Sequence, residues 1–178
     1  ITCIGDKSWT WISSQVNTYD FFELEETHVH TEASLRSYDS KARRAGLRLF
    51  ANPARPTSSK VSVQQADHAS EGGEWLLARA HLQTHRLGAA QAAGGLLAAP
   101  GHQKAYDGFM AMVVHFVGYS IVMIVFYGYS NMGLIGANLG RFTRLLSLLW
   151  ALQLPWVVVG DFNMSPATLS RSGMVERL

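Results

Sequence analysis

Two acidic groups follow apolar stretches of the sequence that have the character of buried strands. In DFFELEETH, Glu26 comes directly after residues 20–24, and in PWVVVGDFN, Asp161 comes after four apolar residues and Gly160. A carboxylate at the end of a buried strand is held rigidly and faces a cleft, where α/β sheets place their ligands. Gly160 is expected to let the backbone turn without a Cβ clash. Asn163 lies two positions after Asp161, so extended backbone would direct both side chains to one side.

These residue types suit metal-assisted cleavage of a phosphodiester. Mg²⁺ or Mn²⁺ takes one or two protein carboxylates and completes its shell with water and substrate phosphate oxygens. The ion neutralises phosphoryl charge, a second carboxylate aligns or deprotonates the attacking water, and an amide donates to a phosphate oxygen. A structural alternative remains for the same residues. Glu25 and Glu26 could start a solvated helix, and Asp161 and Asn163 could form an Asx turn.

Strands and helices alternate around these positions, which favours an α/β domain. Apolar or alternating runs predict strands at 1–4, 20–24, 47–50, 74–81 and 156–159, the last a central strand buried on both faces. Helical spacing predicts a helix at 9–16 capped by Ser8, one at 33–45 ended by Gly46, and one between Asn138 as N-cap and Pro155. Residues 52–56 have the composition of a loop.

The most apolar stretch, residues 109–127, is nearly long enough to span a membrane. His115, Gly118 and Ser120 interrupt it, and β-branched and aromatic residues fill both halves. We therefore expect a buried hairpin turning at 117–120, and no membrane partner. Residues 58–101 lack a clear period and are expected to form a loop or insert within a single domain spanning 1–178.

Composition excludes several classes of protein. The chain has 178 residues, 48% of them hydrophobic, and a net charge of +2, so it is neither disordered nor basic enough to indicate nucleic acid by charge alone. Cys3 is the only cysteine, which excludes a disulfide framework and favours a reducing, intracellular compartment. No signal peptide opens the sequence, and the missing initial Met suggests a piece of a longer protein.

Three segments, in order, resemble the endonuclease/exonuclease/phosphatase superfamily, which has the DNase I-like fold. PWVVVGDFNMSP is similar to its GDFN segment, DFFELEETHVH to its strand ending in Gln-Glu-Thr, and VMIVFYGYSN to its strand ending in a phosphate-contacting tyrosine. The combination of ETH and GDFNM is most similar to apurinic-endonuclease-like and retrotransposon-encoded endonucleases. The resemblance implies a four-layer α/β sandwich, two packed mixed sheets flanked by helices, incomplete at its C-terminus.

The resemblance also implies roles for individual residues. Glu26 would be the principal Mg²⁺ ligand, with Mn²⁺ as a substitute, and Asp161 would orient or activate the attacking water and could also contact the metal. Asn163 would hold the phosphate and position Asp161, and Tyr127 would hydrogen-bond the scissile phosphate. The function implied is Mg²⁺-dependent hydrolysis of phosphodiesters, most simply by an endonuclease acting on DNA in the nucleus. A phosphatase or phospholipase of the same superfamily, and a catalytically silent remnant of a mobile-element endonuclease, are the alternatives.

Three departures from the family pattern qualify these roles. Gly5 stands where the family has a metal-site asparagine, and Asp6 is the candidate to compensate. Glu25 replaces the usual glutamine and adds a negative charge beside Glu26. The family's closing Asp-His pair has no counterpart in the 178 residues, so this chain is expected to be nearly inactive by itself.

Other clusters are weaker candidates. His28 with His30, and His81 with His85, have spacings that could bring two imidazoles together, but neither pair suggests a third ligand. A basic stretch could contact DNA phosphates or could equally be a solvated helix face. Its candidate contacts are Lys41, Arg43, Arg44 and Arg48. No obligate protein partner is inferred.

Overall fold

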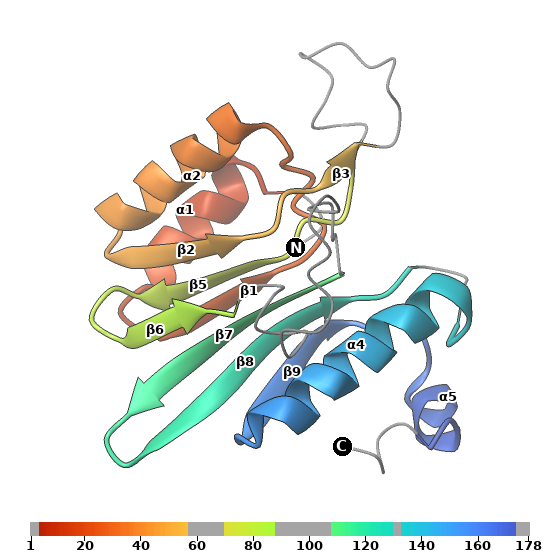
Figure 1. The fold of residues 1–178 in the computed structure, drawn as a ribbon. Helices are drawn as coiled ribbons and strands as arrows, with labels where there is room; N and C mark the ends of the chain where they lie inside the picture. The colour runs from red at the N-terminus through yellow and green to blue at the C-terminus, as the bar shows by residue number, and fades with distance from the viewer. Residues whose placement is uncertain (1–3, 57–69, 88–107, 130–132, 174–178) are drawn as a thin grey trace, which may run out of the picture.

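The computed structural model describes residues 4–56, 70–87, 108–129 and 133–173, and these residues form two stacked β-sheets with helices on the outer faces (Figure 1). The strand predicted at 1–4 lies almost wholly outside the described residues. Of the segment predicted as a loop or insert, only residues 70–87 are described. They contribute strands to both sheets, so this part of the segment belongs to the sandwich.

The first sheet has three antiparallel strands, in the order β1 (Phe21–Leu24), β5 (Trp75–Arg79) and β2 (Leu47–Ala51). Helices α1 (Asp6–Gln15) and α2 (Glu32–Arg44) cover its outer face (Figure 1). Alternate residues of each strand face these helices. The core on this side contains Ile12, Phe22, Leu24, Ala42, Leu47 and Trp75.

The second sheet is mixed and has the order β6 (Gln83–Arg86), β7 (Phe109–Phe116), β8 (Tyr119–Tyr127) and β9 (Trp156–Asp161). Strands β7 and β8 form the predicted antiparallel hairpin, while β8 and β9 run parallel and are joined through α4 (Gly136–Leu152). Helix α4 packs on the outer face of this sheet, and a short helix, α5 (Pro166–Arg171), follows β9 (Figure 1).

A third core lies between the two sheets and holds the sandwich together. It combines Leu76 and Ala78 of β5 with Met110, Met112 and Val114 of β7 and with Val125 of β8. The layers are therefore helices, sheet, sheet and helix, which confirms the predicted DNase I-like architecture. Of the two stacked sheets that the described strands form, only the second contains both parallel and antiparallel pairs. A two-stranded ribbon, β3 (Arg55–Pro56) with β4 (Ser70–Glu71), adds a short antiparallel pair within the segment predicted as a loop.

Residues 109–127 form a hairpin, as predicted, with only Val117 and Gly118 between the two strands. Gly118 has a φ of +86°, a left-handed conformation that glycine adopts at no steric cost. Within the described ranges, no helix is both long and apolar enough to cross a membrane.

The predictions for α1 and β9 are wrong in detail. Helix α1 begins at Asp6 rather than Trp9, because Gly5 is extended and serves as N-cap and the acidic Asp6 suits the first turn. Strand β9 was expected to be central and buried on both faces. In the described sheet it is the last strand, with Val158 packed toward α4 and Val157 38% exposed. The continuous apolar run therefore predicted a strand correctly, but it did not predict the position of that strand in the sheet.

Candidate active site

Glu26, Tyr127 and Asp161 come from three different elements and meet at one end of the sandwich. Glu26 lies two residues after β1, and Tyr127 and Asp161 are the last residues of β8 and β9. Because β8 and β9 are parallel, Tyr127 and Asp161 are register partners and lie side by side. The predicted positions at strand ends are confirmed.

A hydrogen bond joins Glu26 to Tyr127 across the two sheets. The Tyr127 hydroxyl donates to Glu26 Oε1, and the Tyr127 side chain is buried. The backbone around Glu26 is held in a left-handed conformation with φ of +50°. Thr27 N and His28 N donate to the carbonyls of Gly73 and Gly72 at 3.1 Å, so the chain after Glu26 is tied to the segment before β5.

Glu25 makes the second connection between the sheets. Its Oε2 accepts a hydrogen bond of 2.6 Å from the backbone N–H of Asp161. Glu25 was expected only to add charge beside Glu26. It instead places the backbone of Asp161 next to the segment that carries Glu26, which explains how two residues 135 positions apart share one cluster.

Asn163 holds Asp161 but not in the way that extended backbone would. Its φ is +50°, so the two side chains do not project to one side as predicted. Asn163 N donates to Asp161 Oδ1 at 2.8 Å, which is the Asx turn considered as a structural alternative. Asn163 Nδ2 also donates to Gly128 O at 2.5 Å, and Gly128 N donates to Asp161 O at 2.8 Å. Asn163 therefore fixes the loop after β9 against the end of β8 and orients the Asp161 carboxylate.

Gly160 is required for close packing rather than for a turn. It lies inside β9 opposite Phe126 with φ of +150°, and a Cβ there would stand 1.9 Å from the Phe126 carbonyl oxygen. Only glycine lets β9 approach β8 closely enough to bring Asp161 beside Tyr127.

Glu23 is a further member of the cluster that was not among the residues predicted for the site. It alternates with Phe22 and Leu24, so it shares the inter-sheet face with Phe21, and its carboxyl group interacts with that of Glu25. Burial, and then the neighbouring Glu25, raise the pKa of Glu23 to about 8. Burial also raises the pKa of Glu25 from its ordinary value. The period-2 pattern of DFFEL contained the signal, because a carboxylate in phase with Phe21 must face the second sheet.

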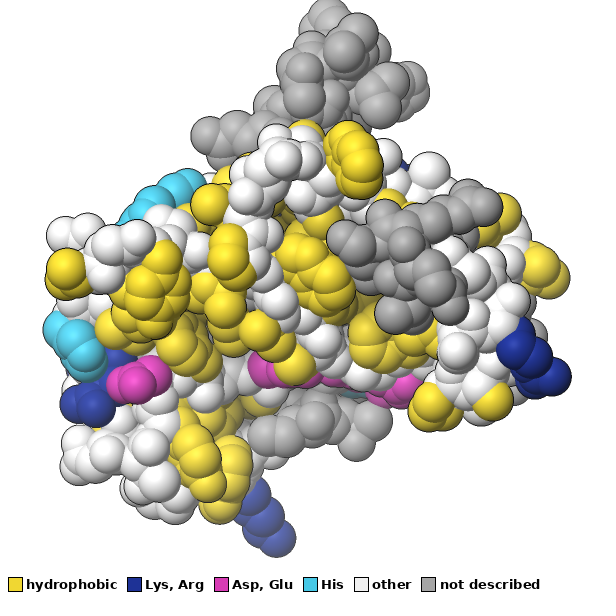
Figure 2. Space-filling model, turned by 90° about the horizontal axis from the view of Figure 1, so that it is seen from below, with side chains coloured by type: hydrophobic (Ala, Val, Ile, Leu, Met, Phe, Trp, Pro, Cys, Tyr) yellow, Lys and Arg dark blue, Asp and Glu magenta, His cyan; other side chains and the backbone are white. Residues whose placement is uncertain are grey.

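We call Glu23, Glu25, Glu26 and Asp161 the acidic cluster. Figure 2 shows Asp and Glu side chains in separate patches across the middle of the face seen from below, and hydrophobic side chains lie above the central patch. Like charges held together in a partly desolvated place favour protonation or a bound cation. The donor set, composed of hard carboxylate oxygens, fits Mg²⁺ or Mn²⁺.

No group of three or more His, Cys, Asp and Glu side chains in the described ranges is arranged to enclose a metal ion. A Mg²⁺ ion does not require one, since it is usually bound through one or two carboxylates with water and phosphate oxygens in the remaining positions. Glu26 and Asp161 are the residues that would hold it.

Two buried polar residues of α4 support the end of β8, and the sequence analysis missed both roles. Asn138 was predicted as an N-cap, but the helix begins at Gly136 after Ile135, and Asn138 is fully buried inside it. Its amide accepts from Tyr129 N at 2.7 Å and donates to Tyr129 O at 2.9 Å. Arg141, 2% exposed, donates to the Tyr127 carbonyl at 2.7 Å, and its guanidinium lies 3.7 Å from the Tyr129 ring centre.

The other charged candidates have partners elsewhere. Asp6, considered as a substitute for the missing asparagine, pairs with Lys41 at 3.2 Å and is 96% exposed, so it does not compensate at the acidic cluster. Arg43 pairs with Asp39 at 2.9 Å. These contacts support the solvated-face interpretation for Lys41 and Arg43, while Arg44 lines a shallow pocket on the helical side.

The histidine spacings did not identify the histidine pair that forms. His85 Nδ1 lies 2.9 Å from His115 Nε2, and His115 Nδ1 lies 2.8 Å from Ser120 Oγ. The pair joins β6 to β7 across the sheet rather than joining His85 to His81. This contact depends on strand register, which local spacing does not reveal.

Comparison with known proteins identifies the fold. No protein-family model matches the sequence, and no curated protein matches it either. The human Nocturnin catalytic domain superposes with a TM-score of 0.58 at 13% identity, covering 94% of this chain and 60% of that one. ANGEL2, described as a 2′,3′-cyclic phosphatase, gives 0.57 at 14% identity, with 94% and 46% covered. A β-hairpin deletion mutant of beta toxin from Staphylococcus aureus gives 0.55 at 13% identity, with 97% and 64% covered.

These similarities, together with the layers and the strand order, show that the chain has the DNase I-like fold. The chain spans between 46% and 64% of the length of the three solved chains. Fold similarity at this level of identity does not assign a substrate.

Proposed function

We propose that this chain supplies part of the active site of a divalent-metal-dependent phosphodiesterase whose substrate is DNA. The observation that supports this proposal is the pair of hydrogen bonds that link the sheets, from Tyr127 to Glu26 and from Asp161 N to Glu25. They bring the residues expected to bind metal, water and phosphate into one cluster. The similar solved structures, one described as a 2′,3′-cyclic phosphatase, are consistent with chemistry at phosphate esters.

Each residue of the cluster has a distinct role in this proposal. A divalent ion held by Glu26, and on its other side by Asp161, would neutralise charge on the phosphoryl oxygens. The exposed Asp161 carboxylate, fixed by the Asn163 N–H, would orient the attacking water and accept its proton. The Tyr127 hydroxyl, adjacent to Glu26, would donate to a non-bridging phosphate oxygen. Glu25 acts through the backbone of Asp161 and is a positioning residue.

DNA is the more specific part of the proposal and rests on the similarity of ETH and GDFNM to endonuclease segments. Lys41 and Arg43, proposed as phosphate contacts, already have carboxylate partners on the helical side of the molecule. A cyclic or mononucleotide phosphate ester is therefore the competing substrate class. A panel containing supercoiled plasmid, a single-stranded oligonucleotide and a 2′,3′-cyclic nucleotide separates the two classes.

The test combines activity with metal binding. Plasmid nicking in Mg²⁺ and in EDTA is measured for the wild-type chain, Glu26→Gln and Asp161→Asn. Loss of a metal ligand or a general base should lower the rate by roughly 10²-fold or more. Glu32→Gln, which removes an exposed carboxylate paired with Arg36, is the matched control and should change nothing.

Calorimetric titration with Mg²⁺ keeps the proposal testable if the 178 residues alone are inactive, as expected from the sequence. Glu26→Gln should weaken Mg²⁺ binding, whereas Glu32→Gln should not. Unchanged nicking in both active-site variants, or equal Mg²⁺ binding by wild type and Glu26→Gln, would show that the proposal is wrong.

A silent, non-catalytic domain is the second candidate function, and one observation favours it. Gly5 provides no side chain where the family places a metal-site asparagine, and the nearest alternative, Asp6, is engaged with Lys41. Under this interpretation the acidic cluster would bind Mg²⁺ weakly, and no member of the substrate panel would be cleaved.

A further inference from the structure

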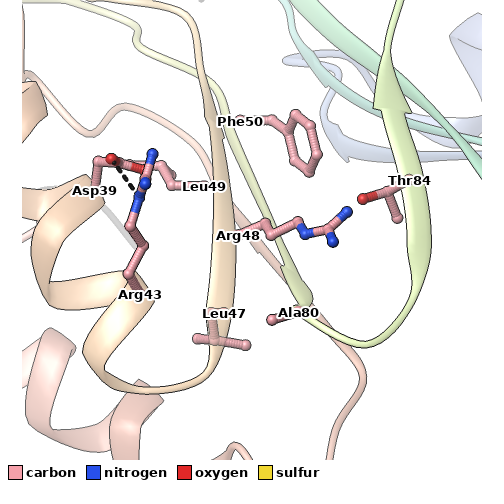
Figure 3. Close-up of a pocket in the computed structure, with 8 residues that line it drawn as sticks. All are labelled: Asp39, Arg43, Leu47, Arg48, Leu49, Phe50, Ala80 and Thr84. Atoms are coloured by element: carbon pink, nitrogen blue, oxygen red, sulfur yellow. Dashed lines mark ion pairs between the residues drawn. The ribbon is translucent and has the colours of Figure 1, made fainter.

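A second cleft lies on the other side of the sandwich from the acidic cluster. Strands β2 and β6 are the outer strands of their sheets, opposite to β1 and β9 respectively. Between β2 and β6 is a surface pocket of about 540 Å³, within the range of small-molecule sites. We call it the arginine cleft. Arg48, Phe50 and Thr84 line it on the inter-sheet side, and Leu47, Leu49, Ala80 and the Asp39–Arg43 ion pair complete its lining (Figure 3).

Arg48 reaches into this cleft because of strand alternation. Leu47 and Leu49 face the helices, so Arg48 and Phe50 face the second sheet. In Figure 3 the Arg48 guanidinium points toward Thr84 on β6, while the Asp39–Arg43 ion pair lies on the other side of β2. No carboxylate in the described ranges pairs with Arg48, so its planar donors are available to an anion.

Thr84 provides a second polar group, and its hydroxyl lacks a hydrogen-bond partner. Its register partner is Val114, a fully buried inter-sheet residue, so the Thr84 side chain also faces the inter-sheet side. Thr84 Oγ1 is buried and has no hydrogen-bond partner among the described residues. Because this atom has no exposed surface, an acceptor in the cleft would reach it once the Thr84 side chain rotates. The hydrogen bond formed would offset the cost of about 1–3 kcal/mol of a buried hydroxyl without a partner.

Apart from the Asp39–Arg43 ion pair, whose charges neutralise each other, the remaining walls are apolar and aromatic. Phe50 presents its ring in the same space as Arg48 and Thr84, and Leu47 and Ala80 lie at one end (Figure 3). A second hollow of about 340 Å³ shares Asp39, Leu49 and Phe50 with the cleft. It is also lined by Arg86 and by the ion pair of Glu32 with Arg36. Arg86 donates to Ala51 O at 3.2 Å and to Asn52 Oδ1 at 2.5 Å, and burial lowers its pKa. Phe50 therefore borders both hollows, with Arg48 lining the first and Arg86 the second.

We propose that the arginine cleft binds a nucleoside phosphate. The phosphate accepts from the Arg48 guanidinium and the Thr84 hydroxyl, and the planar base stacks on Phe50. Guanidinium donors match the geometry of phosphate oxygens, and a base stacked on an aromatic ring is worth about 1–3 kcal/mol. This site is independent of the hydrolytic proposal, because it shares no residue with the acidic cluster.

The experiment titrates the 178-residue chain with AMP, ribose 5-phosphate and adenosine in EDTA, so that no metal-dependent site contributes. AMP should bind at least about tenfold more tightly than either fragment, since it engages both the charged and the aromatic parts. Arg48→Ala should weaken AMP binding by about tenfold or more, and Arg48→Lys by less. Phe50→Leu should abolish the advantage of AMP over ribose 5-phosphate while leaving ribose 5-phosphate binding unchanged.

Thr84→Val tests the hydroxyl without changing the shape of the strand, and we expect AMP affinity to fall by roughly threefold or more. Arg44→Ala is the matched control, because Arg44 is a neighbouring cation that does not line the cleft. Thermal unfolding of each variant confirms that it is folded. Equal AMP binding by wild type and Arg48→Ala, or AMP binding lost in Glu26→Gln but retained in Arg48→Ala, would overturn the proposal.

Discussion

The acidic cluster and the arginine cleft differ in how fully their polar groups are paired. The acidic cluster is connected to its surroundings through Tyr127, Asn163 and the Asp161 backbone. In the arginine cleft, Arg48 lacks an ion-pair partner and Thr84 lacks a hydrogen-bond partner among the described residues. The same packing of two sheets therefore provides a preorganised acidic site and an open cationic one. Substitutions should cost stability on the first side and mainly ligand affinity on the second.

Gly160→Ala should have the largest effect on stability. The added Cβ would meet the Phe126 carbonyl oxygen at 1.9 Å, so β9 must move away from β8 and take Asp161 with it. We expect a loss of about 3–5 kcal/mol in the free energy of unfolding, measured by urea denaturation. Gly140→Ala is the control, since a Cβ in α4 meets only the Arg144 side chain at 3.5 Å and should be neutral or stabilising. Equal effects of the two substitutions would contradict the packing explanation.

Arg141→Met should follow in size. It removes the donor to the Tyr127 carbonyl and the cation over the Tyr129 ring, and leaves a buried carbonyl with one partner fewer. The free energy of unfolding, measured by urea denaturation, should fall by about 2–4 kcal/mol. Mg²⁺ affinity should also fall, because Tyr127 is displaced. Arg144→Met, on the exposed side of the same helix, should change stability by less than about 0.5 kcal/mol. A loss of stability without any change at the acidic cluster would restrict Arg141 to a structural role.

Glu23→Gln should change how the stability of the protein depends on pH, because Glu23 is partly buried beside another carboxylate of the acidic cluster. The pKa of Glu23 is raised from 4.5 to about 8 in the folded protein, so unfolding releases a proton throughout this interval. Stability should therefore fall as pH rises from about 5 to 8, by about 1–2 kcal/mol after allowance for partial solvent exposure. The variant should be less dependent on pH and more stable than wild type at pH 8. Identical pH profiles for both proteins would show that Glu23 is not desolvated.

Thr84→Val tests the opposite side of the comparison. Replacing a buried hydroxyl that lacks a partner with a methyl group of similar shape should raise the free energy of unfolding by about 1 kcal/mol. Thr31→Val is the contrasting control, because Thr31 caps α2 by accepting from Ser34 N at 3.2 Å, and its loss should cost about 1 kcal/mol. If Thr84→Val destabilises the protein by as much as Thr31→Val, the hydroxyl already has a partner.

The elements that the sequence predicted well are those specified by local patterns. Alternation in DFFEL and the interrupted apolar run at 109–127 predicted β1 and the β7–β8 hairpin, and strand ends placed Glu26, Tyr127 and Asp161 correctly. Side-chain periodicity records which face of an element is buried, so it also contained the position of Glu23 on the inter-sheet face.

Features that depend on register or on strand order were not predictable in the same way. Asn138 has a good N-cap residue type, but its burial and its bonds to Tyr129 arise from the packing of α4 on the second sheet. The apolar run of β9 is compatible with a central or an outer strand, and only the pairing with β8 decides between them. The His85–His115 contact likewise requires the alignment of β6 with β7.

Gly5→Asn should have the smallest effect on stability and the most informative one on function. A Cβ at Gly5 meets nothing within 4 Å, its φ of −124° suits any residue, and α1 has no side-chain cap at this position. An asparagine should therefore stabilise α1 by a few tenths of a kcal/mol as N-cap. It would also supply the amide that the sequence resemblance implies for the proposed metal site, so Mg²⁺ affinity measured by calorimetry should rise. Gly5→Ala adds the Cβ without the amide and should do neither. Equal Mg²⁺ affinity for the two variants would mean that Gly5 does not lie at the metal site and that the acidic cluster binds its ion without this position.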